Sequence, residues 1–158
     1  MAMNLNQFKI TNRAGLVMNP AANVIQCQVL PTLATTSYLS AGQVVAFGTD
    51  TGSTPIVRAV ANAGGCGIGI IVYNMKTDKY YARYICGVAL DGSIITCNAD
   101  VAMTRGNIVG WGSGGVRPIA NTSFGIGITL DNATAANDIV RVLVQTGISG
   151  TGGLSWQS

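Results

Sequence analysis

The chain has 158 residues, of which 48% are hydrophobic, so it holds enough apolar material for a buried core and is not disordered throughout. Only 9% of the residues are charged, far below the roughly 25% usual for soluble domains. Much of the exterior must therefore consist of neutral residues such as asparagine, threonine and serine, or be covered by another protein, and we expect an oligomer. The basic residues are spread singly and the net charge is only +3, which argues against a nucleic-acid partner.

The first 23 residues are rich in asparagine and hold scattered apolar residues, so we predict an extended arm with one short strand. Alternating and β-branched runs then predict strands over residues 24–30, 43–47, 56–60, 67–73, 80–90 and 93–97. Residues 100–104 have the composition of a short helical turn, but no segment has a sustained helical apolar stripe. Further strands are predicted over residues 108–111, 116–120, 125–130 and 139–146, before a Gly/Ser-rich tail over residues 148–158.

Two stretches of the chain share one pattern. Residues 41–49 (AGQVVAFGT) match residues 105–113 (RGNIVGWGS), and each is followed by Gly-Ile-Gly-Ile, at residues 67–70 and 125–128. Arg83 and Arg141 then each stand inside an apolar run. The sequence therefore predicts an all-β fold, a compact β-barrel or sandwich built from an internal duplication, with extended N- and C-terminal arms. We expect one domain over residues 24–147, with repeat one at about residues 40–90 and repeat two at about residues 104–146.

The composition removes most catalytic and metal-binding chemistry. The chain has no histidine and no glutamate, so neither an imidazole base nor a histidine metal site can be built. The aspartates at 50, 91, 131 and 138 stand beside turn residues, where a carboxylate usually caps backbone amides. The glycine-rich strands lack the helix of a dinucleotide site. We therefore expect no enzyme, no catalytic residue, no metal and no cofactor.

The four cysteines contain no CxxC pair, which argues against a zinc ribbon or a redox motif. We expect free thiols packed as small apolar groups in strands. A bridge between Cys86 and Cys97 across neighbouring strands is the alternative.

No apolar run is long enough to span a bilayer, and the N-terminus does not resemble a secretory signal. We therefore expect no membrane partner and synthesis in the cytoplasm.

Several side chains are candidates for the core or for interfaces. Phe47 and Trp111 occupy matching positions of the two repeats, so we expect both in the core. Arg83 and Arg141 are expected on the outer face of strands; the alternative is an ion pair with a loop aspartate of another subunit.

Apolar residues in the two arms have nothing local to pack against. Trp156 lies in the Gly/Ser tail with Leu154, and Phe8 and Leu16 lie in the N-terminal arm. Their apolar area should find a pocket elsewhere, on the chain's own body or on a neighbour. With Arg83 and Arg141 these residues form our candidate subunit or capsid interface.

The order of motifs suggests a family. The Ala/Arg-Gly-x-x-Val phrase, the Gly-Ile-Gly-Ile strand and a final Val-Arg-Val-Leu-Val strand resemble the small capsid decoration, or cement, proteins of tailed bacteriophages. Residues 135–144 (AANDIVRVLV) stand where those proteins have a phrase such as Ala-x-Gly-Asp-x-Val-x-Val. The resemblance covers about residues 40–147. It implies a structural protein, characteristically a homotrimer, that binds the major capsid protein on the outer surface of the icosahedral virion head and clamps neighbouring subunits.

Two other functions compete with this one. A virion spike or tail module that binds a receptor or carbohydrate would use the tyrosines at 73, 80, 81 and 84 as a stacking surface. The adjacent Tyr80 and Tyr81 must, however, face opposite sides of a strand. An aspartate-based hydrolase is the remotest alternative, because histidine and glutamate are missing.

Overall fold

A computed structural model describes residues 13–49, 54–60, 67–119 and 124–149, and these residues form strands and no helix. The all-β fold with a β-barrel is therefore confirmed, and the predicted helical turn at residues 100–104 is wrong for this part of the chain. The strands are β1 (Val24–Val29), β2 (Leu39–Ser40), β3 (Val44–Phe47), β4 (Ile56–Ala59), β5 (Gly69–Ile71), β6 (Lys79–Tyr80), β7 (Ile85–Ala89), β8 (Ile94–Asn98), β9 (Ile108–Trp111), β10 (Val116–Pro118), β11 (Phe124–Thr129) and β12 (Ile139–Ser149).

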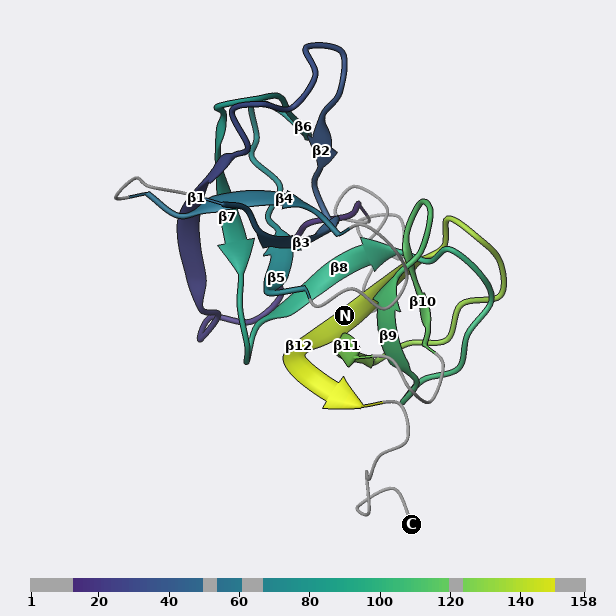
Figure 1. Ribbon diagram of the computed structural model, residues 1–158. Coiled ribbons are helices and arrows are strands. Elements are labelled where there is room, and N and C mark those ends of the chain that lie inside the picture. Colours follow the sequence, from purple (N-terminus) through teal and green to yellow (C-terminus); the bar gives the residue numbers. More distant parts are fainter. Residues whose placement is uncertain (1–12, 50–53, 61–66, 120–123, 150–158) are drawn as a thin grey trace, which may run out of the picture.

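Five strands of the first half close into a barrel, in the order β1-β4-β3-β5-β7. Antiparallel pairing of β1 with β7 and parallel pairing of β1 with β4 complete the closure. We call this unit barrel one. The short β2 and β6 form a two-stranded antiparallel sheet above barrel one, near the top of Figure 1.

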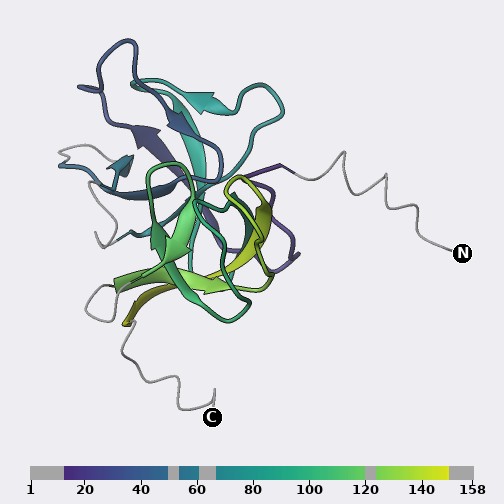
Figure 2. The ribbon, with the colours of Figure 1, turned by 90° about the vertical axis from the view of Figure 1, so that its right-hand side faces the viewer.

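Five strands of the second half form a sheet in the order β10-β9-β11-β12-β8, which we call sheet two. A parallel bridge between Ala99 and Val116 links the ends of its two outer strands, as β1 is linked to β4 in barrel one. Barrel one lies at the upper left of Figure 1 and sheet two at the lower right. In the view of Figure 2, barrel one lies above sheet two.

The backbone hydrogen bonds of the two units repeat almost one for one. Val29 N–H donates to Tyr84 O at 2.8 Å in barrel one, and Ala99 N–H donates to Asp138 O at 2.8 Å in sheet two. The Leu39–Tyr80 pair of β2 and β6 likewise has its counterpart in a bridge between Met103 and Ala133. The duplication is therefore present in the hydrogen-bond pattern as well as in the sequence.

The hydrogen bonds also correct the alignment of the repeats. β1 precedes residue 40 but belongs to barrel one, so the first repeat begins one strand earlier than the sequence indicated. Arg83 lies in the turn before β7 and matches Asn137, because their N–H groups donate to Val29 O and to Ala99 O. Both residues have the left-handed φ of 69°. The predicted match of Arg83 with Arg141, and the predicted strand around Arg83, are wrong.

Two hydrophobic clusters fill the molecule. One lies inside barrel one and includes Val29, Val45 and Tyr80. The other joins the outer face of barrel one to the inner face of sheet two, with Ile70 and Ile95 among its members. Both faces of β3 and β5 are buried, one inside barrel one and the other against sheet two. This burial explains why the two strands have almost no polar residues.

The glycines of the repeated Gly-Ile-Gly-Ile phrase lie where strands come close together. A Cβ atom at Gly69 would collide with Ala89 O, and one at Gly127 would collide with Leu143 O. Glycine inside a strand is typical of such a close backbone approach, and both repeats have it.

Candidate functional site

Three tyrosines form a row on the surface of barrel one. Tyr38 precedes β2, and Tyr81 and Tyr84 lie in the turn between β6 and β7. The ring centroids of Tyr38 and Tyr81 are 5.7 Å apart, as are those of Tyr81 and Tyr84, and both pairs meet edge to face. Tyr38 and Tyr84 remain 42% and 48% exposed. The row is thus ordered by ring contacts but is not buried by them.

Basic groups adjoin this row. Lys79 Nζ lies 4.9 Å from the ring centroid of Tyr38, within the range of a cation–π contact. Arg83, an exposed residue, immediately precedes Tyr84 in the turn. We call Tyr38, Lys79, Tyr81, Arg83 and Tyr84 the aromatic patch.

The second repeat builds the same turn without these side chains. Its hydrogen-bond pattern places Ala102, Ala135 and Asp138 at the positions of Tyr38, Tyr81 and Tyr84. Asp138 instead caps its own turn, because its Oδ2 accepts from Thr134 N–H at 2.7 Å and from Ala135 N–H at 3.1 Å. Since the turn forms equally well with small and capping residues, the fold does not require the tyrosine row.

Arg83 gives a second contrast between the repeats. Asparagine adopts the left-handed region at low energetic cost, so a φ of 69° does not strain Asn137. The same φ at Arg83 costs about 1–2 kcal/mol. Strained backbone positions often coincide with functional sites. A strained arginine beside exposed tyrosines therefore marks this turn as a candidate binding surface.

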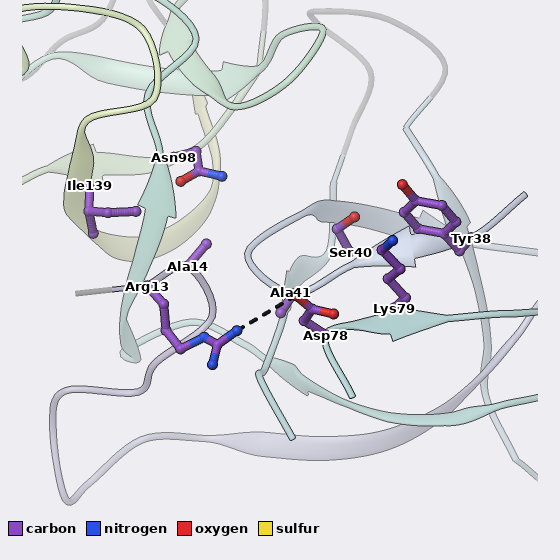
Figure 3. A pocket seen from close by; sticks show the side chains of 9 residues that line it. All are labelled: Arg13, Ala14, Tyr38, Ser40, Ala41, Asp78, Lys79, Asn98 and Ile139. Atoms are coloured by element: carbon purple, nitrogen blue, oxygen red, sulfur yellow. Dashed lines mark ion pairs between the residues drawn. The ribbon is translucent and has the colours of Figure 1, made fainter. Parts of the chain in front are cut away.

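A polar cleft opens beside the patch, between the β2–β6 pair and sheet two (Figure 3). Its volume is about 360 Å³. Arg13 Nη2 lies 3.6 Å from Asp78 Oδ2 in the lining of the cleft, and the same guanidinium lies 3.8 Å from the centroid of the Tyr73 ring. The lining residues are Arg13, Ala14, Tyr38, Ser40, Ala41, Asp78, Lys79, Asn98 and Ile139.

A neighbouring hollow of about 220 Å³ shares part of this lining and reaches Trp111. Trp111 is partly buried and packs against the second hydrophobic cluster. Phe47, by contrast, is 53% exposed at the end of β3. The prediction of a core position is therefore wrong for Phe47, because its strand ends there.

The five described aspartates all bond to the chain itself. Asp131 accepts two hydrogen bonds from the Arg141 side chain, at 2.9 and 2.6 Å, and these bonds with Arg141 hold the pKa of Asp131 below its ordinary value. The amide and hydroxyl donors of Thr134 and the amide of Ala135 lower the pKa of Asp138. Asp91 Oδ1 accepts from Thr146 N–H at 2.9 Å. Turn capping and ion pairing thus occupy these carboxylates, while Asp50 lies outside the described residues.

Three described cysteines are buried free thiols: Cys27, Cys86 and Cys97, which we call the core cysteines. Burial raises the pKa of Cys86 and of Cys97 to about 12. Cys86 faces Cys27 across the β1–β7 pair, and Cys97 lies in sheet two, so the alternative of a Cys86–Cys97 bridge is wrong. Cys66 lies outside the described residues.

The residues proposed from sequence as an interface are scattered. Phe8, Leu154 and Trp156 lie outside the described residues. Leu16 is half-buried in a segment beside β8, and Arg141 is exposed on β12 and paired with Asp131 of its own chain. Of the three described residues, Leu16, Arg83 and Arg141, only Arg83 adjoins the tyrosine row.

The stacking surface predicted for the alternative function also changes. Tyr80 is buried and its hydroxyl donates to Val72 O at 2.8 Å, while Tyr73 lies under Arg13. Tyr81 and Tyr84 instead meet Tyr38, which the sequence reasoning missed. A comparison of the two repeats could have indicated Tyr38, because the second repeat has the small Ala102 at the matching position.

Comparison with known proteins assigns no family: no protein-family model matches the chain, and no curated protein matches it. Among the described residues there is no helix long and apolar enough to cross a membrane, and no group of acidic, cysteine or histidine side chains that could hold a metal ion.

Proposed function

We propose that the chain is a structural capsid decoration protein. In this proposal a homotrimer binds the major capsid protein on the exterior of a phage head and clamps neighbouring subunits. The observation that carries the proposal is the aromatic patch, which one repeat has and the other lacks although their backbones match. The motif order of residues 40–147 selects the capsid as the partner. No catalytic step or cofactor is part of this function.

The patch has the composition of a protein-binding surface. Tyrosine and arginine are enriched where partners bind, because they offer large contact areas with polar tips at low entropic cost. The rings of Tyr38 and Tyr84 are partly exposed and already ordered by Tyr81, so little conformational freedom is lost on docking. Several patches on one oligomer would raise the avidity for a shell with repeated sites.

The proposal is tested by replacing the patch with the residues of the second repeat. A variant carrying Tyr38→Ala, Tyr81→Ala and Tyr84→Asp should keep the fold, because those side chains already serve the same turn in sheet two. We expect it to lose at least tenfold in affinity for purified capsids in a co-sedimentation assay. The control is Phe47→Ala, which removes an equally exposed ring of barrel one outside the patch. Unchanged capsid binding by the triple variant would contradict the proposal.

A second function is favoured by the cleft beside the patch. Tyr38, Asp78 and Asn98 line one hollow, and such a combination of an aromatic ring with polar groups suits a sugar, which has an apolar face and polar edges (Figure 3). A virion spike or tail module that binds carbohydrate would use it. Binding on a microarray of bacterial surface polysaccharides, lost on Tyr38→Ala, would favour this function. An array without any bound glycan would remove it.

A further inference from the structure

Charge is distributed unevenly between the two units. The described residues up to residue 90 carry five basic side chains and one acidic side chain, a net charge of +4. The described residues from 91 to 149 carry three basic side chains and four acidic ones, a net charge of −1. Barrel one, with the segment before it, is therefore the positive part of the molecule. Its basic residues are Arg13, Arg58, Lys76, Lys79 and Arg83.

The arginines of sheet two lie beside carboxylates of the same unit. Arg117 Nη1 lies 3.6 Å from Asp100 Oδ2. Arg141 Nη2 lies 2.6 Å from Asp131 Oδ1. The hydrogen bonds from Arg141, and in addition the charge of Arg105, hold the pKa of Asp131 below its ordinary value. A carboxylate from another protein would have to compete with these partners, so sheet two is poorly suited to an acidic surface.

The two cations of the aromatic patch have no carboxylate of their own. The Asp78 carboxylate pairs with Arg13 at 3.6 Å. Lys79 Nζ lies beside the Tyr38 ring instead, 4.9 Å from its centroid (Figure 3). Among the described residues, no acidic side chain forms an ion pair with Lys79 or Arg83, and both are exposed. Their charges are therefore available to a carboxylate from outside the chain.

The tyrosine row lies between these two cations. Lys79 adjoins Tyr38 at one end of the row, and Arg83 precedes Tyr84 at the other end. Within the described residues, no hydroxyl of the row is hydrogen-bonded. A phenol can donate to a carboxylate, and a hydrogen bond with an ionised partner is roughly twice as strong as a neutral one. The patch thus combines two cations and three hydroxyl donors on one exposed surface.

The second repeat has neither cation. Asn137 stands at the position of Arg83. The strand pairing places Asn132 at the position of Lys79. Asn132 Oδ1 accepts a hydrogen bond from Arg105 N–H at 2.8 Å, so this side chain serves its own turn. The basic residues, like the tyrosines, are therefore additions to a turn that folds without them.

We propose that the aromatic patch binds an acidic segment of the major capsid protein. Carboxylates of that segment face Lys79 and Arg83, and an apolar side chain of the segment packs on the tyrosine rings. The inference rests on the proposed function and gives the chemistry of the surface that the patch recognises. Complementary charge speeds encounter and fixes the register of binding, and it rejects partners of like charge. The difference in charge between the units also orients the protein, with barrel one toward the shell and sheet two away from it.

Capsid binding at two salt concentrations tests the charge complementarity. Raising NaCl from about 0.1 M to about 1 M shortens the Debye length from about 10 Å to about 3 Å, and co-sedimentation of the wild type with purified capsids should weaken about tenfold. Arg83→Glu should weaken binding at the lower salt concentration by about tenfold or more. The control is Arg105→Glu, which makes the same change of charge at an exposed arginine of sheet two and should alter the affinity by no more than about twofold.

Zero-length cross-linking identifies the partner directly. A carbodiimide joins the Lys79 amine to a carboxylate in contact with it, as an amide formed with loss of water. Mass spectrometry of the digested complex should place this amide on an acidic residue of the major capsid protein. Lys79→Arg keeps the charge but lacks the amine, so this control should bind capsids and give no link. Arg83→Lys should add a second link to the same acidic segment.

The outcomes separate this inference from the proposed function. Capsid binding that is unaffected by salt or by Arg83→Glu, or Lys79 links confined to its own chain, would overturn the inference. If the triple tyrosine variant loses capsid binding while Arg83→Glu keeps it, the inference fails and the proposed function stands. Binding that depends on Arg83 and is directed to an acidic bacterial polysaccharide, with no binding to capsids, would assign the patch to a glycan and overturn both.

Discussion

Gly127→Ala should strongly destabilise the protein, because β11 and β12 have no room for a methyl group at this position. A Cβ atom there would collide with Leu143 O of the neighbouring strand and would lie 2.9 Å from Val142 Cγ1, whereas real Cβ atoms essentially never come within 3.0 Å. Backbone cannot rotate away as a side chain can, so the strands must separate and weaken their hydrogen bonds. We expect a loss of about 3 kcal/mol, the upper end of the usual cost of overpacking.

Urea unfolding, followed by far-UV circular dichroism at one protein concentration, measures this loss. With a denaturant slope of about 2 kcal/mol per molar, the midpoint should fall by about 1.5 M. The control is Gly87→Ala on β7, where the nearest atom to the new methyl group is Val24 Cγ1 of an exposed side chain, at 3.2 Å. That control should change the free energy of unfolding by no more than about 0.5 kcal/mol. Equal midpoints for the two variants would refute the argument that glycine is needed for strand approach.

Three further predictions follow from the same contacts. Arg83→Gly should stabilise the protein by about 0.5–1 kcal/mol, since relief of the left-handed backbone strain exceeds the entropic cost of glycine. Asn137→Gly should gain less stability. Equal urea midpoints for the two variants would contradict this prediction. Asp131→Asn should cost about 0.5–1 kcal/mol at pH 7. The pairing with Arg141 lowers the pKa of Asp131, so the stabilisation is present above the ordinary carboxyl pKa and is lost as the pH falls through the pKa of the folded state. The free energies of unfolding of the wild type and the variant should therefore converge near about pH 2. A difference that stays constant with pH would count against the ion pair. In a Cys66→Ser background the core cysteines should resist a thiol reagent at pH 8 in the native state and react fully in denaturant, because burial raises their pKa; rapid native labelling would contradict their burial.

Local patterns predicted most of the strands. β9 has the predicted bounds, and every end of β1, β3, β4, β8 and β11 lies within one residue of its predicted position. These strands were predictable because alternation and β-branched residues bounded by turn residues are local signals. The run from residue 80 to residue 90 was misread as one strand. Tyrosine favours strands wherever it stands, but the turn at Arg83 depends on hydrogen bonds to Val29, more than fifty residues away.

The candidate site was harder to predict than the fold. The repeated Gly-Val and Gly-Ile phrases revealed the duplication, but they did not show that β1 belongs to the first repeat. The hydrogen bonds align residues 24–28 of β1 (VIQCQ) with residues 94–98 of β8 (IITCN), so the similarity of these two short strands was an available signal. The aromatic patch joins Tyr38 to Tyr81 across more than forty residues, and only the pairing of β2 with β6 brings them together. With the correct alignment of Arg83 and Asn137, the tyrosines would have stood out as the difference between the repeats.

The central proposal is that this chain decorates a phage capsid through the aromatic patch of barrel one. An image reconstruction of particles made with the chain, compared with particles lacking its gene, tests it most directly. The account predicts ordered density at the local three-fold positions of the shell, with Tyr38 and Tyr84 against the major capsid protein, and weaker resistance to heat when the gene is deleted. Unchanged shells, with density missing only from a tail or a vertex, would contradict it.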